Sequence, residues 1–154
     1  MKNKFMTRAI ELSIESVNTG GGPFGSVIVK DEKIIAEGFN KVTSTNDPTA
    51  HGEIVAIRKA CKSLNNFNLS GCELYSTCEP CPMCLSAIYW AHIDKVYYAN
   101  TRDDAKKIDF DDSLIYEQLT KSIKERKIRM TQLMRNEALK AFELWDKKTD
   151  KVKY

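Results

Sequence analysis

One split pattern constrains the fold of this chain more than any other feature. The segment His51–Glu53 is followed about thirty residues later by Pro80–Cys84. An imidazole and two cysteine sulfurs are ligands of tetrahedral Zn²⁺, and three protein ligands leave the fourth position for water. The fold therefore has to bring His51 to Cys81 and Cys84, and the sequence predicts a catalytic zinc site with these three ligands.

Glu53 follows His51 by two residues and is expected to handle the protons of the water. Zinc lowers the pKa of bound water from 15.7 toward about 7 in favourable sites. A glutamate that accepts the water proton and delivers it to the substrate typically contributes about a hundred- to ten-thousand-fold in rate. We therefore expect Glu53 to be the catalytic acid and base.

The alternative is a closed structural zinc site, which normally has four protein ligands. Cys78 could supply the fourth, because Cys78-x-x-Cys81-x-x-Cys84 repeats one spacing. A structural site would leave Glu53 without a task, so the catalytic interpretation is preferred. Cys81 and Cys84 lie three residues apart and should share one face near a helix start, where the helix dipole favours thiolates.

Composition indicates a single globular domain over residues 1–154. The chain has 42% hydrophobic and 29% charged residues, and no run of about eighteen apolar residues that could cross a membrane. Its five cysteines are odd in number and three of them are clustered, which favours metal chemistry in a reducing compartment over disulfides. With no apolar signal-peptide block after Met1, we expect a cytoplasmic protein.

The charge pattern argues against a dedicated nucleic-acid binder. The net charge is only +3, and acidic residues are interleaved with the basic clusters at Lys121–Arg129 and Lys147–Lys153. A polynucleotide-binding surface is usually more one-sided. Nucleic acid is therefore an unlikely partner on composition alone.

Hydrophobic periodicity predicts an alternation of helices and strands. Helices are expected over residues 5–17, 51–64, 81–91, 113–121 and 137–148, and strands over 24–29, 34–39, 73–77, 95–99 and 127–134, with a polar loop over 43–49. This order favours a mixed sheet with helices on both faces.

Further motifs identify a resemblance. The pattern H-x-E followed by P-C-x-x-C is the signature of zinc nucleobase deaminases. Together with Asn46–His51, Cys78–Leu85 and Ala87–Ala91, it resembles the cytidine-deaminase-like superfamily, and within it the bacterial guanine deaminases. The similarity runs nearly end to end and includes Gly21–Gly25, Glu37–Asn40, Phe110–Ser113, Ile115-Tyr116, Phe142-x-x-Trp145 and Tyr154.

The resemblance implies an α/β fold in three layers, α-β-α, around a mixed five-stranded sheet. It implies one catalytic zinc ion per subunit and a homodimer. In similar guanine deaminases the C-terminal segment, about residues 135–154 here, crosses to the partner subunit. There its final tyrosine, Tyr154, helps to close the partner's site.

The resemblance also implies the substrate contacts. Asn40 would hydrogen-bond the purine, and Phe24, His51 and Trp90 would shape an aromatic slot. Asp112 and, from the other chain, Tyr154 would read the polar edge of the base. The backbone N–H of Gly52 would face the substrate, although this position is usually alanine in the family.

Each of these residues also has an ordinary structural explanation. Asn40 could form a turn, Phe24 and Trp90 could be core aromatics, and Asp112 could cap the helix that follows it. Tyr154 ends the chain, where disorder is common.

The activity implied by the resemblance is hydrolysis of guanine to xanthine and ammonia, with attack at C2 and proton delivery to N3 by Glu53. A tRNA adenosine deaminase is the nearest rival, because it shares the Asp47–His51 run. Guanosine, cytosine or a related amino-heterocycle is also possible on this scaffold. A zinc-stabilised interaction module without activity is a further alternative, and the presence of Glu53 argues against it.

Overall fold

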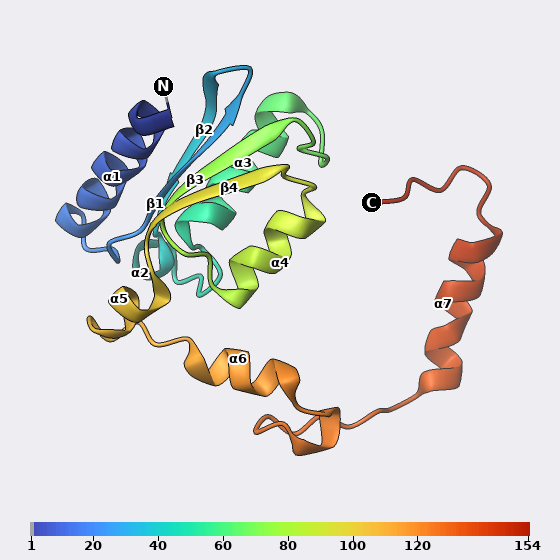
Figure 1. Ribbon diagram of the computed structural model, residues 1–154. Helices are drawn as coiled ribbons and strands as arrows, with labels where there is room; N and C mark the ends of the chain where they lie inside the picture. The colour runs from blue at the N-terminus through green and yellow to red at the C-terminus, as the bar shows by residue number, and fades with distance from the viewer. Residues whose placement is uncertain (1) are drawn as a thin grey trace. The chain divides into compact units, whose positions relative to one another are not determined.

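A four-stranded sheet forms the centre of the first of two units, Met1–Asp112 and Ser113–Tyr154, in this computed structural model, which describes residues 2–154. The order is β2-β1-β3-β4 (Figure 1), and the strands are β1 (Gly25–Lys30), β2 (Lys33–Phe39), β3 (Cys72–Cys78) and β4 (Lys95–Asn100). β1 is antiparallel to both β2 and β3, whereas β3 and β4 are parallel. The predicted mixed sheet is thus confirmed.

Helices cover both faces of this sheet (Figure 1). On one face α1 (Lys2–Asn18) packs on Val27, Val29 and Tyr75, which with Phe5, Ala9 and Leu12 form one buried cluster. On the other face α3 (Gly52–Leu64) and α4 (Pro82–Trp90) cover Ile28 and Leu74 in a second cluster. Successive strand residues therefore point to opposite faces, as the two-residue period requires.

The prediction of a fifth strand over residues 127–134 was wrong. The sheet has four strands, and these residues form neither helix nor strand before α7 (Arg135–Lys147) begins. Alternating side chains make a segment compatible with a strand, but a strand forms only where its backbone groups find an edge to pair with. Local alternation cannot reveal whether that edge is available.

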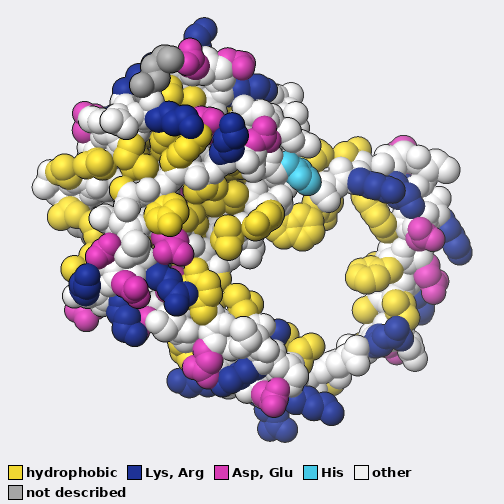
Figure 2. Space-filling view, in the orientation of Figure 1, with side chains coloured by type: hydrophobic (Ala, Val, Ile, Leu, Met, Phe, Trp, Pro, Cys, Tyr) yellow, Lys and Arg dark blue, Asp and Glu magenta, His cyan; other side chains and the backbone are white. Residues whose placement is uncertain are grey.

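The second unit consists of helices and connecting segments. It contains α6 (Ser113–Thr120), the 3₁₀ turn η1 (Ile123–Glu125) and α7. No residue of α6 or α7 is buried, and Phe142 and Leu144 of α7 are 74% and 73% exposed. Hydrophobic side chains are correspondingly visible on the surface of α7 (Figure 2).

Two short helices of the first unit were not predicted. α2 (Val42–Thr45) overlaps the start of the polar loop predicted over residues 43–49. α5 (Arg102–Lys106) begins with a capping box, in which the Thr101 and Asp104 side chains satisfy each other's backbone N–H groups. Among the described residues no helix is both long and apolar enough to cross a membrane.

Glycines let two helices lie directly against the sheet. A Cβ atom at Gly38 of β2 would lie 2.3 Å from the carbonyl oxygen of Gly52 and 2.6 Å from the backbone nitrogen of Ala56 in α3. At Gly25 of β1 it would lie 2.3 Å from the carbonyl oxygen of Ala9 in α1. Gly38 therefore determines how closely α3, which carries His51 and Glu53 at its start, approaches the strands.

We predict that Gly38→Ala lowers the free energy of unfolding by about 1–3 kcal/mol, because the added methyl group has to push α3 away from β2. Urea denaturation followed by circular dichroism measures this loss. The matched control is Gly52→Ala, whose Cβ would lie 3.2 Å from the Phe24 carbonyl oxygen. It should change stability by less than about 1 kcal/mol. Equal losses in the two variants would contradict this role of Gly38.

Candidate active site

The helices α3 and α4 each begin at a predicted metal ligand. His51 is the N-cap of α3 and Cys81 the N-cap of α4, and both have extended backbone, with ψ of 156° and 168°. Their carbonyl groups accept the first helical hydrogen bonds, from Val55 at 2.9 Å and Leu85 at 2.8 Å. The helix predicted from Cys81 thus begins one residue later. Two helix N-termini, both of positive partial charge, therefore meet at the metal ligands.

The three predicted ligands converge. His51 Nδ1 lies 3.6 Å from the sulfurs of both Cys81 and Cys84, and all three ligand atoms lie within 4.8 Å of one another. Ligands bound tetrahedrally to zinc at 2.0–2.3 Å are themselves separated by about 3.6 Å. The donor set and its spacing therefore fit Zn²⁺.

Glu53 lies beside this group in the interior. Its side chain is only 5% exposed. Its Oε1 accepts a hydrogen bond of 3.1 Å from Ser76 Oγ, and its Oε2 lies 3.5 Å from Cys84 Sγ. One carboxylate oxygen is thus held by the sheet, while the other is directed to the metal ligands.

The pKa values of the two cysteine ligands are shifted in opposite directions. Hydrogen bonds from Cys84 and His51 lower the pKa of Cys81 to about 4, so its thiolate is the stable form. The hydrogen bond that Cys84 donates to Cys81 raises the pKa of Cys84. Burial raises the pKa of Glu53, and the contact with Cys81 raises that of His51. Metal binding requires both thiols to ionise.

Cys78 does not belong to the metal-binding group. It is buried, and its thiol donates to the carbonyl oxygen of Thr101 at 3.6 Å. Burial raises its pKa to about 11, which keeps the thiol protonated. Among the described residues the cluster thus has three protein ligands, as an open catalytic site requires.

Asn40, Phe24 and Gly52 meet at the end of β2. The backbone N–H of Asn40 donates to the Phe24 carbonyl oxygen at 2.9 Å, and Gly52 lies against that same carbonyl. The amide oxygen of Asn40 accepts from the N–H of Val42 at 3.1 Å, the contact expected of a turn-forming asparagine. The Phe24 ring packs edge-on against Phe110, with centroids 4.9 Å apart.

The other three predicted substrate residues differ in position. Asp112 is partly buried, and its pKa is raised by burial and by the negative charge of Cys81, so it lies within electrostatic reach of the ligands. Trp90 ends α4 and is 65% exposed, so it is not a core aromatic. Tyr154 belongs to the second unit and is exposed.

Sequence reasoning assigned no role to Ser26, Ser76 or Phe110. Ser26 and Ser76 are buried below Glu53, and Phe110 packs on Phe24. One available signal was a serine inside an otherwise apolar strand, Phe24–Val29. A buried hydroxyl in such a strand needs a polar partner, and here the partner network leads to Glu53.

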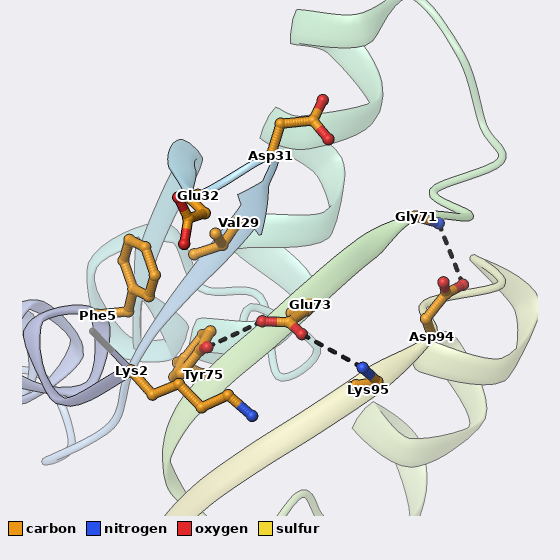
Figure 3. Close-up of a pocket in the computed structure, with 10 residues that line it drawn as sticks. All are labelled: Lys2, Phe5, Val29, Asp31, Glu32, Gly71, Glu73, Tyr75, Asp94 and Lys95. Carbon is orange, nitrogen blue, oxygen red and sulfur yellow. Dashed lines mark hydrogen bonds and ion pairs between the residues drawn. The ribbon is translucent and has the colours of Figure 1, made fainter.

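A cavity of about 390 Å³ lies elsewhere, where β1 ends and β3 and β4 begin (Figure 3). None of the predicted site residues lines it. Glu73 in its wall accepts a hydrogen bond of 2.9 Å from the Tyr75 hydroxyl and pairs with Lys95 at 3.8 Å. Its carboxylate is therefore already satisfied, and the metal-binding group lies beyond the other end of β3.

Comparison with known proteins adds the family context. Residues 1–100 match the family described as cytidine and deoxycytidylate deaminase zinc-binding region. The chain is 53% identical over 151 residues to the guanine deaminase of Bacillus subtilis (strain 168), covering 97% of each chain. It matches an X-ray structure of guanine deaminase from Bacillus subtilis with a TM-score of 0.95 and 52% identity, over 99% of this chain and 98% of that one.

A second group of relatives is similar over a smaller part of the chain. The tRNA-specific adenosine deaminase of Aquifex aeolicus (strain VF5) is 42% identical over 98 residues, which is 64% of this chain and 65% of the relative. The tRNA-specific adenosine deaminase of Buchnera aphidicola subsp. Schizaphis graminum (strain Sg) is 35% identical over 137 residues, which is 88% of this chain. The guanine deaminase of Bacillus subtilis exceeds both of these relatives in identity, at 53%, and in coverage, at 97%.

We predict that the protein binds one zinc ion per chain and that Cys81→Ala and Cys84→Ala each abolish stoichiometric binding. Removing one of three ligands leaves too few donors to hold the metal. Elemental analysis of the purified variants provides the measurement. Cys78→Ala is the matched control and should keep its zinc, because that thiol faces Thr101. Zinc loss in Cys78→Ala would instead favour a closed structural site.

Proposed function

This chain belongs to the guanine deaminases within the zinc-binding cytidine and deoxycytidylate deaminase family, and from this membership we propose that it hydrolyses guanine to xanthine and ammonia. One observation carries the chemistry: His51, Cys81 and Cys84 form a three-ligand group with the buried Glu53 beside it. The near full-length similarity to guanine deaminase carries the choice of base.

The proposed reaction replaces the amino group at C2 of guanine by oxygen. Zinc, when bound, supplies the activation of a water molecule near neutral pH. Glu53 takes a proton from the nucleophile, delivers it to ring N3, and then assists the departure of ammonia as the C2–N bond breaks. The burial of Glu53 restricts proton exchange with bulk water during these transfers.

We propose that Asn40, Phe24 and Gly52 form one wall of the guanine site. The contacts among these three residues support this proposal. The Phe24 carbonyl oxygen accepts a hydrogen bond from the backbone N–H of Asn40 and lies against Gly52 at the start of α3. The side-chain amide of Asn40 would hydrogen-bond the base, the Phe24 ring would stack on it, and the Gly52 N–H would donate to it.

Asp112 and Trp90 are proposed to complete the contacts within the subunit. The electrostatic effect of Cys81 on Asp112 supports a position near the metal ligands, from which its carboxylate can accept from N–H groups of the base. Trp90 lies on the same helix as Cys84 and offers an exposed aromatic surface.

We further propose a homodimer in which residues of about 135–154 cross to the partner subunit, so that Tyr154 closes the other site. The support is that α7 buries none of its residues, so that its apolar side chains, Phe142 and Leu144 among them, are accessible to a partner. Residues 1–154 then act as one deaminase domain completed by a second copy.

We also propose a cytoplasmic location. The five free cysteines support it, because thiols stay reduced in that compartment.

We predict that purified protein consumes guanine in an ultraviolet absorbance assay and leaves guanosine, cytosine and adenine unchanged. Glu53→Gln should keep its zinc and lose at least about a hundredfold in kcat, since the amide cannot shuttle protons. Glu73→Gln, a carboxylate substitution at the remote cavity, is the matched control and should retain full turnover. Turnover of adenosine in tRNA without turnover of free guanine would instead establish the rival substrate.

We predict that deletion of Tyr154 lowers kcat/KM for guanine at least tenfold while zinc content stays unchanged. Complementation tests the crossing of the tail. Glu53→Gln subunits, which keep Tyr154, are unfolded and refolded together with Tyr154-deleted subunits, which keep Glu53. A tail that crosses rebuilds one complete site per mixed dimer, so activity rises above that of either variant alone. Unchanged activity in dimers shown to be mixed would place the tail on its own subunit.

A further inference from the structure

Two serines are buried side by side beneath the start of α3. Ser26 of β1 and Ser76 of β3 are direct partners in the antiparallel register, and their exposed fractions are 0% and 2%. They share the sheet face of Ile28 and Leu74, whose surroundings are apolar. A buried hydroxyl costs free energy unless it is hydrogen-bonded, and alanine would fill such positions without that cost.

The two hydroxyls form a directed chain that ends on Glu53. Ser26 Oγ donates to Ser76 Oγ at 3.2 Å, and Ser76 Oγ donates to Glu53 Oε1 at 3.1 Å. Hydrogen bonds in series polarise one another, so the first strengthens the second. Among the described residues of the sheet, only Ser76 donates a side-chain hydrogen bond to the Glu53 carboxylate.

We propose that Ser76 is a positioning residue for Glu53 and that Ser26 acts through Ser76. The Ser76 hydroxyl holds Oε1 and fixes the rotation of the carboxylate, which directs Oε2 to the side of the metal ligands, where it lies 3.5 Å from Cys84 Sγ. The paired strands β1 and β3 thereby orient Oε2, the oxygen that would transfer the proton. This inference rests on the proposed deamination and adds residues to its machinery.

The consequence is specific to the chemical step. The orientation of the Glu53 carboxylate matters when the proton is transferred, whereas the guanine base is bound by other residues. A misplacement of about 1 Å at a catalytic group can lower the rate a hundredfold. We therefore expect Ser76→Ala to lower kcat tenfold to a hundredfold, with KM and zinc content unchanged within about twofold. Ser26→Ala should lower kcat about two- to fivefold.

A double-mutant cycle tests the relay. If Ser26 acts through Ser76, Ser26→Ala should have no further effect on kcat in a Ser76→Ala background. Additive effects would refute the relay. Tyr75→Phe is the matched control: it removes a buried hydroxyl from the neighbouring residue, whose side chain lies on the opposite face and donates to Glu73. It should leave kcat unchanged.

The remaining outcomes separate the inference from the proposed function. Wild-type kcat in Ser76→Ala, or a loss of zinc in step with kcat, would overturn the positioning role. A wild-type protein that turns over a base other than guanine would overturn the proposed substrate alone. The cycle is then measured on that base, and the same kcat and KM criteria decide the role of Ser76.

Discussion

The meeting of two helix N-termini is the constraint on which the rest of this structure depends. α3 and α4 start at His51 and Cys81, with Cys84 in the first turn of α4, and the three ligand atoms lie within 4.8 Å. The positive ends of both helix dipoles stabilise thiolates there. This meeting requires α3 to lie directly on the sheet, which Gly38 permits by offering no side chain to its backbone.

The sheet contributes more than support for these helices. A cluster of apolar and aromatic side chains fills the face below α1, and the face below α3 carries the hydroxyls of Ser26 and Ser76 into the interior. Burying Glu53 without partners would be costly, and the hydroxyl of Ser76 offsets part of that cost by binding Oε1. Ser26 and Ser76 thus place polar groups in an otherwise apolar sheet face at the point where Glu53 is buried.

Features that depend on neighbouring residues could be predicted from the sequence, whereas contacts between residues far apart in the sequence could not. The helices at residues 51–64 and 81–91 and the strands of the sheet were predicted to within a few residues, because apolar periodicity, proline and glycine act locally. The strand expected over residues 127–134 did not form, since pairing depends on a distant edge. Ser76 was overlooked for the same reason: its partner Glu53 is 23 residues away and joins it only through packing.

The sequence alone identified the three residues that form the candidate metal-binding group, the glutamate beside them, and the helices that carry them, because ligand chemistry and helix signals are properties of neighbouring residues. Tertiary structure alone decided that Cys78 faces Thr101 and lies outside the ligand group, and that Ser76, which accepts from Ser26, donates to the Glu53 carboxylate. Which side chains face each other across strands 50 residues apart depends on sheet register, and register is a property of the packed molecule.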